Sequence, residues 1–314
     1  MTLLLFVNGG FVVAKRFYYG GQAIIEGVMM RGRKAVITAV RRPNGEVVID
    51  AKPLPGIASD RLRKVPLVRG VAVLIEAMVL GIKALLYSAN VSMEEEEEGE
   101  EGGKLPAGAT WAMMIGALIG VVALFFLAPL FITNLVSAHV GSSIVFHLIE
   151  GFIRLGIFIA YLKLITLAPD VKRVFAYHGA EHKVINAYED GVPLELEAVR
   201  KYDTAHVRCG TSFLFIVLII AIIVFALVGR PSLGVMVLSR VVLIPVIAGL
   251  GYEITYFGAR HVSSRLVRAF LAPGLWLQGL TTREPDDSQV EVAMSALKRA
   301  VEVDEVEEAA QSSS

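Results

Sequence analysis

The chain has 314 residues, of which 55% are hydrophobic and 19% charged, and its mean hydropathy is +0.62. Soluble domains average about 45–50% apolar and about 25% charged residues, so this composition excludes an ordinary soluble enzyme. Thirty Lys and Arg balance thirty Asp and Glu, so net charge indicates no particular partner, and the single cysteine, Cys209, excludes a disulfide framework and fits a reducing compartment.

The N-terminal part is predicted to form a lead-in (1–17) and a small basic β unit (18–64). No positive residue precedes the apolar Leu3–Val7, and Gly9-Gly10 interrupts it, so a signal peptide is not expected. KAVITAVRR and EVVIDAK flank the turn Pro43-Asn44-Gly45, which predicts a β-hairpin, and the preceding GGQAIIEGVMMRG could add a third strand. The basic surface could meet anionic lipids. Nucleic acid is disfavoured, because aromatic residues are not interleaved with the charges.

An apolar segment of helix length follows at 65–92. Arg69, Glu76, Lys83 and Asn90 recur every seven residues and would form one polar stripe on a helix. The segment is either an amphipathic helix along the membrane surface or a re-entrant or spanning helix whose stripe faces a polar interior. The acidic stretch that follows, 93–108, is predicted to be a disordered linker.

Four long apolar runs predict four transmembrane helices arranged as two hairpins, at 109–168 and 209–258. Lys and Arg concentrate in 1–110, in the loop 169–208 and in the tail 259–314, whereas the two hairpin joints hold only Arg230. This bias predicts that both termini and the central loop are cytoplasmic. The four runs are Trp111–Val136, Ser143–Ala168, Gly210–Val228 and Leu233–Phe257.

The tail contains a predicted amphipathic helix near 287–308, which Asp286 or Asp287 could cap. Taken together, the pattern predicts a mainly α multi-pass membrane protein with four transmembrane helices. A small cytosolic α+β region, containing the N-terminal β-hairpin and an amphipathic helix, would be assembled from the N-terminal segment, the central loop and the tail.

The central loop carries the strongest chemical signal, His178-Gly179-Ala180-Glu181-His182, which reads H-x-x-E-H. On a helix His178 and His182 lie one turn apart on the same face and could share one divalent metal ion, zinc being the best match. Glu181 could accept a proton from a water molecule on that metal, as in the inverted form of the HExxH metalloprotease signature. The alternative is that these histidines only hydrogen-bond to loop carbonyls, and Gly179 weakens the prediction of a helix.

Further ligands are predicted near the same membrane face. His206 and Cys209 lie three residues apart where the loop enters the third run, and both could reach a metal. Cys209 could equally be a small buried thiol. Glu253, near the cytoplasmic end of the fourth run, and Glu26, in the β unit, are additional candidates.

A second group of ionisable residues lies inside the predicted spans. His147, Glu150 and Arg154 share one helical face of the second run, and Arg240 belongs to the fourth. Ionisable side chains at membrane depth must face a bundle interior or water. They predict either a structural ion pair that locks the bundle or a polar path for a substrate or proton.

Five segments in this order resemble the YqhQ-like family of bacterial integral membrane proteins, over roughly residues 18–308: GGQAIIEGVMMRG, YHGAEHKVINAYE, HVRCGTSF, SRVVLIPVIAGLGYE and APGLWLQGLTTREP. The resemblance implies a protein of the bacterial cytoplasmic membrane, in a family of unknown function described as predicted metal-dependent enzymes. It implies no substrate. The positions that match the family's motifs are Glu26, Arg31, His178, Glu181, His182, His206, Cys209 and Glu253.

The sequence therefore favours a metal-dependent, hydrolytic membrane enzyme with its site at the cytoplasmic face. His178 and His182 would be ligands together with His206 or Cys209, and Glu181 would be the general base. One alternative is a non-enzymatic scaffold or membrane-protein biogenesis factor that receives another membrane protein. A second is ion or solute transport, which would require a homo-oligomer because the spans are few and no inverted repeat is evident.

Overall fold

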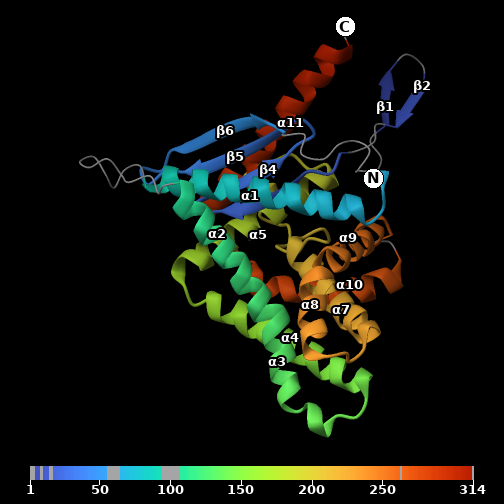
Figure 1. The fold of residues 1–314 in the computed structure, drawn as a ribbon. Helices are drawn as coiled ribbons and strands as arrows, with labels where there is room; N and C mark the ends of the chain where they lie inside the picture. The colour runs from blue at the N-terminus through green and yellow to red at the C-terminus, as the bar shows by residue number, and fades with distance from the viewer. Residues whose placement is uncertain are drawn as a thin grey trace.

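The structure is a computed structural model that describes residues 4–7, 10–13, 17–54, 64–93, 107–261 and 264–312. Most of the predicted acidic linker lies outside these ranges. A layered α/β part sits on one end of a helical bundle, and the helix α1, Val68–Met93, lies between them (Figure 1). The predicted fold class, a mainly helical membrane protein with a small N-terminal sheet, is confirmed.

The main sheet has four antiparallel strands in the order β3-β4-β5-β6, so each strand pairs with the next along the chain. The segment that could have added one strand forms two, β3 and β4, which are joined by a tight turn at Ile25-Glu26. A separate two-stranded hairpin, β1–β2, occupies part of the predicted lead-in. The strands are β1 Leu4–Val7, β2 Gly10–Val13, β3 Gly20–Ile24, β4 Gly27–Arg31, β5 Ala35–Arg41 and β6 Val47–Pro53.

The two central strands are apolar at almost every position because both faces of the sheet are covered. In β4, Val28 and Met30 point into a core shared with α5 (Pro169–Asp190) and α11 (Asp287–Ser312). The alternate residue Met29 points into a core with Leu80 of α1. Successive side chains of a strand point to opposite faces, so a strand between two layers needs no polar side.

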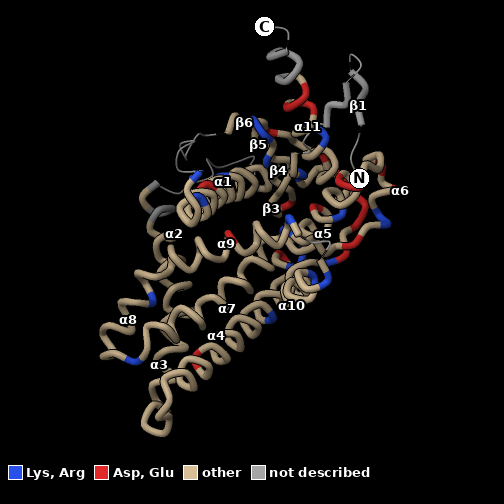
Figure 2. Tube along the Cα trace, turned by 90° about the vertical axis from the view of Figure 1, so that its right-hand side faces the viewer, with Lys and Arg blue, Asp and Glu red and all other residues tan. Residues whose placement is uncertain are grey.

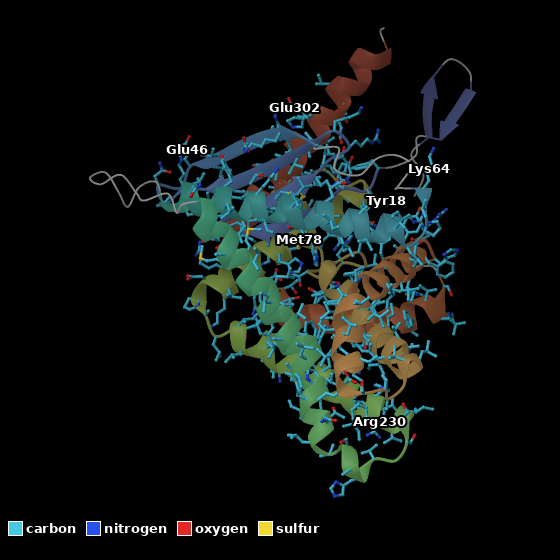
Figure 3. All side chains as sticks on the ribbon, viewed as in Figure 1. Tyr18, Glu46, Lys64, Met78, Arg230 and Glu302 are labelled. Carbon is cyan, nitrogen blue, oxygen red and sulfur yellow. The ribbon has the colours of Figure 1, made fainter. Side chains whose placement is uncertain are left out.

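Helix α1 lies across the end of the bundle, and Figures 1 and 2 show this from two directions. One side packs on the sheet, while Ile75, Met78 and Leu85 on other sides are 44–52% exposed. In Figure 3, Met78 lies on the side of α1 away from the sheet. Two residues of the polar stripe form ion pairs with other parts of the chain. Glu76 is buried against Arg31 at 2.7 Å, and Arg69 binds Glu253 through two hydrogen bonds.

The bundle contains three unbroken helical segments that are long and apolar enough to cross a membrane: Ala112–Leu135, Ser143–Ile165 and Gly210–Val228. Helix α1 also meets these criteria by length and composition. The fourth predicted span is different, because it is broken into α8 (Leu233–Val242) and α9 (Ile244–Arg260), which are bent by 47°. Pro245 explains the break, since proline has no N–H to donate and its ring clashes with the preceding turn.

The first span also departs from a regular α-helix. One π-helical turn, η2, separates α2 from α3. Helix α10 lies across α7 and approaches it closely at Gly274, where a Cβ atom would lie only 3.0–3.2 Å from Ser212. The remaining bounds are α2 Ala107–Val122, η2 Ala123–Leu127, α3 Ala128–Leu135, η3 Ser137–His139, α4 Ser143–Ile165, α6 Leu196–Val199, α7 Gly210–Val228 and α10 Arg265–Thr281.

Candidate metal centre

The H-x-x-E-H sequence lies in the middle of α5, as a continuous helix. Proline fits the first turn of this helix at Pro169, and Gly191 ends it in the left-handed conformation with φ 74°. Gly179 does not interrupt the helix. It lies against the backbone carbonyl of Arg283, where a larger residue would collide. The glycine is therefore explained by close packing between α5 and the segment after α10.

Three side chains converge at this point, and we call His178, His182 and Cys209 the ligand cluster. One donor atom from each lies within 4.8 Å of the others, so the cluster could hold a metal ion. Nε2 of His178 is 3.3 Å from Sγ of Cys209. The two imidazole ring centres are 4.4 Å apart. His178 is half-buried, and the other two residues are buried.

The two histidines of the ligand cluster are held by backbone carbonyls. Nδ1 of His178 lies 2.8 Å from the carbonyl oxygen of Thr281, and Nδ1 of His182 lies 2.6 Å from that of Thr204. A carbonyl can only accept, so each Nδ1 carries the proton and donates it. Each Nε2 is then left with a free lone pair, which is the arrangement that metal-bound histidines commonly show.

Cys209 is the N-cap residue of α7, and its sulfur accepts a hydrogen bond from the backbone N–H of Thr211 at 3.4 Å. The unpaired N–H groups and the dipole at a helix N-terminus stabilise negative charge. The sulfur is therefore fixed at the start of the span, 3.3 Å from Nε2 of His178.

The loop between α6 and α7 is fastened to α5 by side chains adjacent to the motif. Lys183 donates to the carbonyls of Arg200 and Tyr202, at 2.9 and 2.7 Å. Asn186 donates to two further carbonyls of the same loop. The sequence analysis did not identify these residues as part of the site. Their signal was a lysine directly after H-x-x-E-H and an asparagine three residues later.

His206 lies beside the ligand cluster, with its ring centre 5.6 Å from that of His182. Its Nε2 is buried and has no hydrogen-bond partner within the described part of the chain. Burial lowers the pKa of His206 and outweighs the opposing charge of Glu181. The imidazole is therefore neutral near pH 7 and keeps a lone pair for a ligand. Gln278 of α10 holds the backbone of His206 at both its N–H and its carbonyl.

Glu181 faces the sheet, and its two oxygens have different surroundings. Oε1 accepts a hydrogen bond from the backbone N–H of Gly21 in β3, at 3.0 Å. Oε2 lies 3.5 Å from Nε2 of His182, next to the ligand cluster. The side chain is almost completely buried. One oxygen is thus anchored, while the other lies beside a candidate ligand atom.

The structure does not bring the two additional candidates to the ligand cluster. Glu26, at the β3–β4 turn, binds Arg173 of α5 through two hydrogen bonds of 2.5 Å and also accepts one from Tyr177. Glu253 binds Arg69 and the backbone N–H of Leu67. Both carboxylates join helices to the sheet layer or to α1. Burial and the neighbouring carboxylate raise the pKa of Tyr177, so its hydroxyl remains a donor.

The ionisable residues inside the spans form a separate group, and we call His147, Glu150, Arg154 and Arg240 the membrane-depth cluster. All four are at most 1% exposed. Glu150 accepts hydrogen bonds from Arg154 at 2.6 Å and from Arg240 at 2.5 and 3.2 Å. His147 lies 3.0 Å from Glu150 and 2.9 Å from the carbonyl of Gly229. The cluster thus connects α4 to α8 and to the end of α7.

The π-helical turn η2 takes part in the membrane-depth cluster. Nε of Arg154 donates to the carbonyl of Phe125 at 2.9 Å, within that turn. A π turn disrupts the regular helical hydrogen-bond pattern, so it can present a carbonyl to a side chain. Phe225 lies under both guanidinium groups, with 5.1 Å to Arg154 and 4.3 Å to Arg240.

Comparison with known proteins identifies a family of unknown function. The family described as "Protein of unknown function (DUF1385)" matches residues 65–303. The chain is also 36% identical over 302 residues to "Uncharacterized protein YqhQ" of Bacillus subtilis (strain 168), covering 92% of this chain and 94% of the relative. No solved structure matches.

Proposed function

The chain belongs to the DUF1385 family of unknown function, and we propose that it is a metal-dependent hydrolase acting at the cytoplasmic face of a bacterial membrane. The observation that carries the proposal is the ligand cluster. Its three donor atoms converge, and both histidines have their Nδ1 held by carbonyls. One thiolate and two imidazoles suit a borderline metal, and zinc is the ion we propose.

Each residue around the ligand cluster has a distinct proposed role. His178, His182 and Cys209 would hold the ion and leave the fourth position of a tetrahedral zinc for water. His206 would lie beside them, with its Nε2 3.6 Å from Oε2 of Glu189. The ion would supply a Lewis acid that makes water more acidic. Glu181 would accept the proton from the attacking water at Oε2 and return it to the leaving group. Its Oε1 stays on Gly21, which keeps the carboxylate in place.

The proposed substrate is lipid-linked or embedded in the membrane. Cys209 caps α7, so the ligand cluster lies where the chain enters its most apolar span. Lys and Arg gather at the sheet-bearing end of the bundle, whereas Arg230 lies at the opposite end (Figures 2 and 3). This bias supports the orientation we propose, with the sheet and both termini in the cytoplasm.

Metal analysis tests the first part of the proposal. Protein purified without a metal-affinity tag should contain about one zinc per chain by mass spectrometry, a ratio typical of a structured zinc site. The variant His178→Ala/His182→Ala should contain almost none. Cobalt substitution adds a spectroscopic test, because a thiolate–cobalt absorption band should disappear in Cys209→Ser. A metal-free wild-type protein, even after incubation with zinc, would contradict the proposal.

A variant of Glu181 separates the enzyme from the two alternatives. Glu181→Gln should keep the metal and the fold but lose hydrolysis of ester, amide and phosphodiester reporters that the wild type cleaves. A scaffold would tolerate Glu181→Gln and fail instead on charge reversal at Glu76 or Arg154. A transporter would show solute flux in liposomes that Glu150→Gln abolishes.

A further inference from the structure

Three exposed arginines lie at the corner between α9 and α10. Arg260 ends α9, and Arg265 and Arg268 lie in the first turn of α10. All three are exposed. Within the described ranges, which omit residues 262–263, no carboxylate lies within ion-pair distance of any of them. Arg260 contacts only the ring and hydroxyl of Tyr256.

Three arginines of the sheet layer are different, because each has a carboxylate partner. The exposed Arg200 pairs with Asp287 and the exposed Arg299 with Glu302, and the partly exposed Arg42 pairs with Glu46. The charges of these three arginines are therefore balanced locally. The three arginines at the α9–α10 corner present uncompensated positive charge, which calls for an anionic partner outside the chain.

Large exposed apolar side chains lie on the same two helices as these arginines. Phe257 is 58% exposed, Leu266 84% and Phe270 54%, and Trp276 follows farther along α10 at 66%. Exposed aromatic rings beside arginines are typical of a helix at the boundary between headgroups and acyl chains. A soluble acidic protein would match the charges but would leave these apolar surfaces in water.

The corner is firmly placed at the sheet-bearing end of the bundle. Leu271 of α10 packs against Gly258 of α9, and Arg69 of α1 lies over the ring of Tyr256 at 4.8 Å. In Figure 2 basic residues lie near α10 at this end. The corner therefore adjoins the leaflet that faces the sheet layer.

We infer that the α9–α10 corner binds the headgroup of an anionic phospholipid from this leaflet. The guanidinium groups of Arg260, Arg265 and Arg268 would bind the phosphate oxygens, which match their paired donors. The acyl chains would lie along Leu266 and Phe270. The inference does not depend on the ligand cluster, since none of its residues belongs to the corner.

A tryptophan placed at the corner can report which lipids lie there. The chain has two tryptophans, so Trp111→Phe/Trp276→Phe/Phe270→Trp leaves one fluorophore on α10, among the exposed apolar side chains of the corner. The full-length reporter is reconstituted into phosphatidylcholine vesicles that contain either brominated phosphatidylglycerol or brominated phosphatidylcholine. Bromine quenches nearby tryptophan, so the two quenching curves give the relative affinity of the corner for the anionic lipid.

We expect phosphatidylglycerol to be preferred by about fivefold or more, because each basic residue near an anionic surface contributes up to about that factor. Arg260→Gln/Arg265→Gln/Arg268→Gln should abolish the preference. Replacement of the same residues by lysine, which preserves the charge, should retain part of it. Arg42→Gln/Arg200→Gln/Arg299→Gln removes the same number of charges from the sheet layer and should leave it unchanged.

Two results would overturn the inference. One is equal quenching by both lipids in the unaltered corner. The other is an equal loss of preference in the corner variant and the sheet-layer variant, which would assign the effect to total charge. If the triple corner variant does not fold, Arg265→Gln/Arg268→Gln gives the same test, since both residues lie exposed in the first turn of α10.

Discussion

The ligand cluster and the membrane-depth cluster are both built from buried polar side chains, yet they differ in how those groups are satisfied. In the membrane-depth cluster Glu150 accepts from two arginines, and both nitrogens of His147 have partners within the chain. In the ligand cluster the Nδ1 atoms are held at 2.6–2.8 Å, whereas the other atoms have only longer contacts, 3.3 Å between Nε2 of His178 and the sulfur of Cys209 and 3.5 Å between Nε2 of His182 and Glu181.

The difference separates a structural role from a binding role. Burying a charge is tolerated when neighbouring groups compensate it, and the membrane-depth cluster supplies that compensation internally. Lone pairs that converge on one point repel one another unless a cation or proton lies between them. We therefore interpret the membrane-depth cluster as a brace among α4, α7 and α8, and the ligand cluster as a site that needs a partner.

The strongest test of this comparison is the removal of the carboxylate of the brace. Glu150→Leu would leave two guanidinium groups buried without a counter-charge, and we expect it to lower the free energy of unfolding by about 3–5 kcal/mol. Denaturant titration in detergent micelles measures the change. Zinc bound per folded chain should not change, and a stable variant would contradict the assignment of Glu150 to a structural role.

The second test removes a proposed metal ligand, Cys209. Cys209→Ser should weaken zinc binding by more than the ~10–100-fold typical for the loss of an outer-shell contact. With zinc removed by a chelator, its free energy of unfolding should stay within about 1 kcal/mol of the wild-type value, because serine is close in size to the buried cysteine and is a favoured N-cap residue. Competition with a chromophoric chelator gives the affinity. Zinc binding equal to the wild type would exclude Cys209 from the set.

An intermediate effect is expected from Gln278, which supports the ligand cluster from a distance. This buried side chain bonds to the backbone of His206 and to Ser212, and Gln278→Ala should weaken zinc binding by about 10–100-fold. Ser288→Ala, which alters a half-buried residue at the start of α11, is the control. Equal affinities in the two variants would show that His206 does not contribute.

The smallest effect is expected at Asp286, which lies outside both clusters. Its loss of stability gives a reference value for the losses expected within them. Asp286 caps α11 and accepts from the backbone N–H of Gln289, whose side chain bonds back to the N–H of Asp286. Asp286→Ala should cost about 1 kcal/mol at pH 7 by the same denaturant titration. A variant that lost as much stability as Glu150→Leu would invalidate the scale.

The same residue gives a pH dependence with a definite sign. Burial opposes ionisation of Asp286, but hydrogen bonds from Ser288 and Gln289 outweigh it and lower its pKa below 3.8. The stabilisation is therefore complete above about pH 3.8, the unfolded value, and disappears as the pH falls through the lower folded value. The difference between wild type and Asp286→Ala should shrink over that range. A difference that stayed constant would contradict the role of the ionised cap.

Regular patterns made much of the fold predictable from the sequence. Long apolar runs predict the spans, and Pro43-Asn44-Gly45 predicts the turn between β5 and β6. The helix that carries His178 and His182 was only a condition of the metal hypothesis, because 169–208 was predicted as a loop and Gly179 weakened the prediction of a helix. Two departures depend on local backbone geometry that periodicity does not report. One is the π turn in the first span, and the other is the bend at Pro245 in the fourth.

The candidate site was predictable in its residue types but not in its supports. His178, His182 and Cys209 stand out because imidazole and thiol groups are rare in this chain. Thr204 and Thr281 act through their backbone carbonyls, which every residue has, so no side-chain pattern could reveal them. Glu253 and Glu26 share the charge of a ligand, and only the fold shows that Arg69 and Arg173 bind them.

The π turn η2 also sets how the first span tolerates changes in length. Such a turn holds one residue more than an α-helical turn, so deleting one residue between Ala123 and Leu127 would convert it to a regular helix. Because the wider turn absorbs its extra residue, α3 beyond the deletion would keep the face that it packs against α4. The Phe125 carbonyl, however, would return to a regular helical hydrogen bond and would be lost to Arg154. The extra residue in this span thus serves a side-chain contact at membrane depth and not the length of the helix.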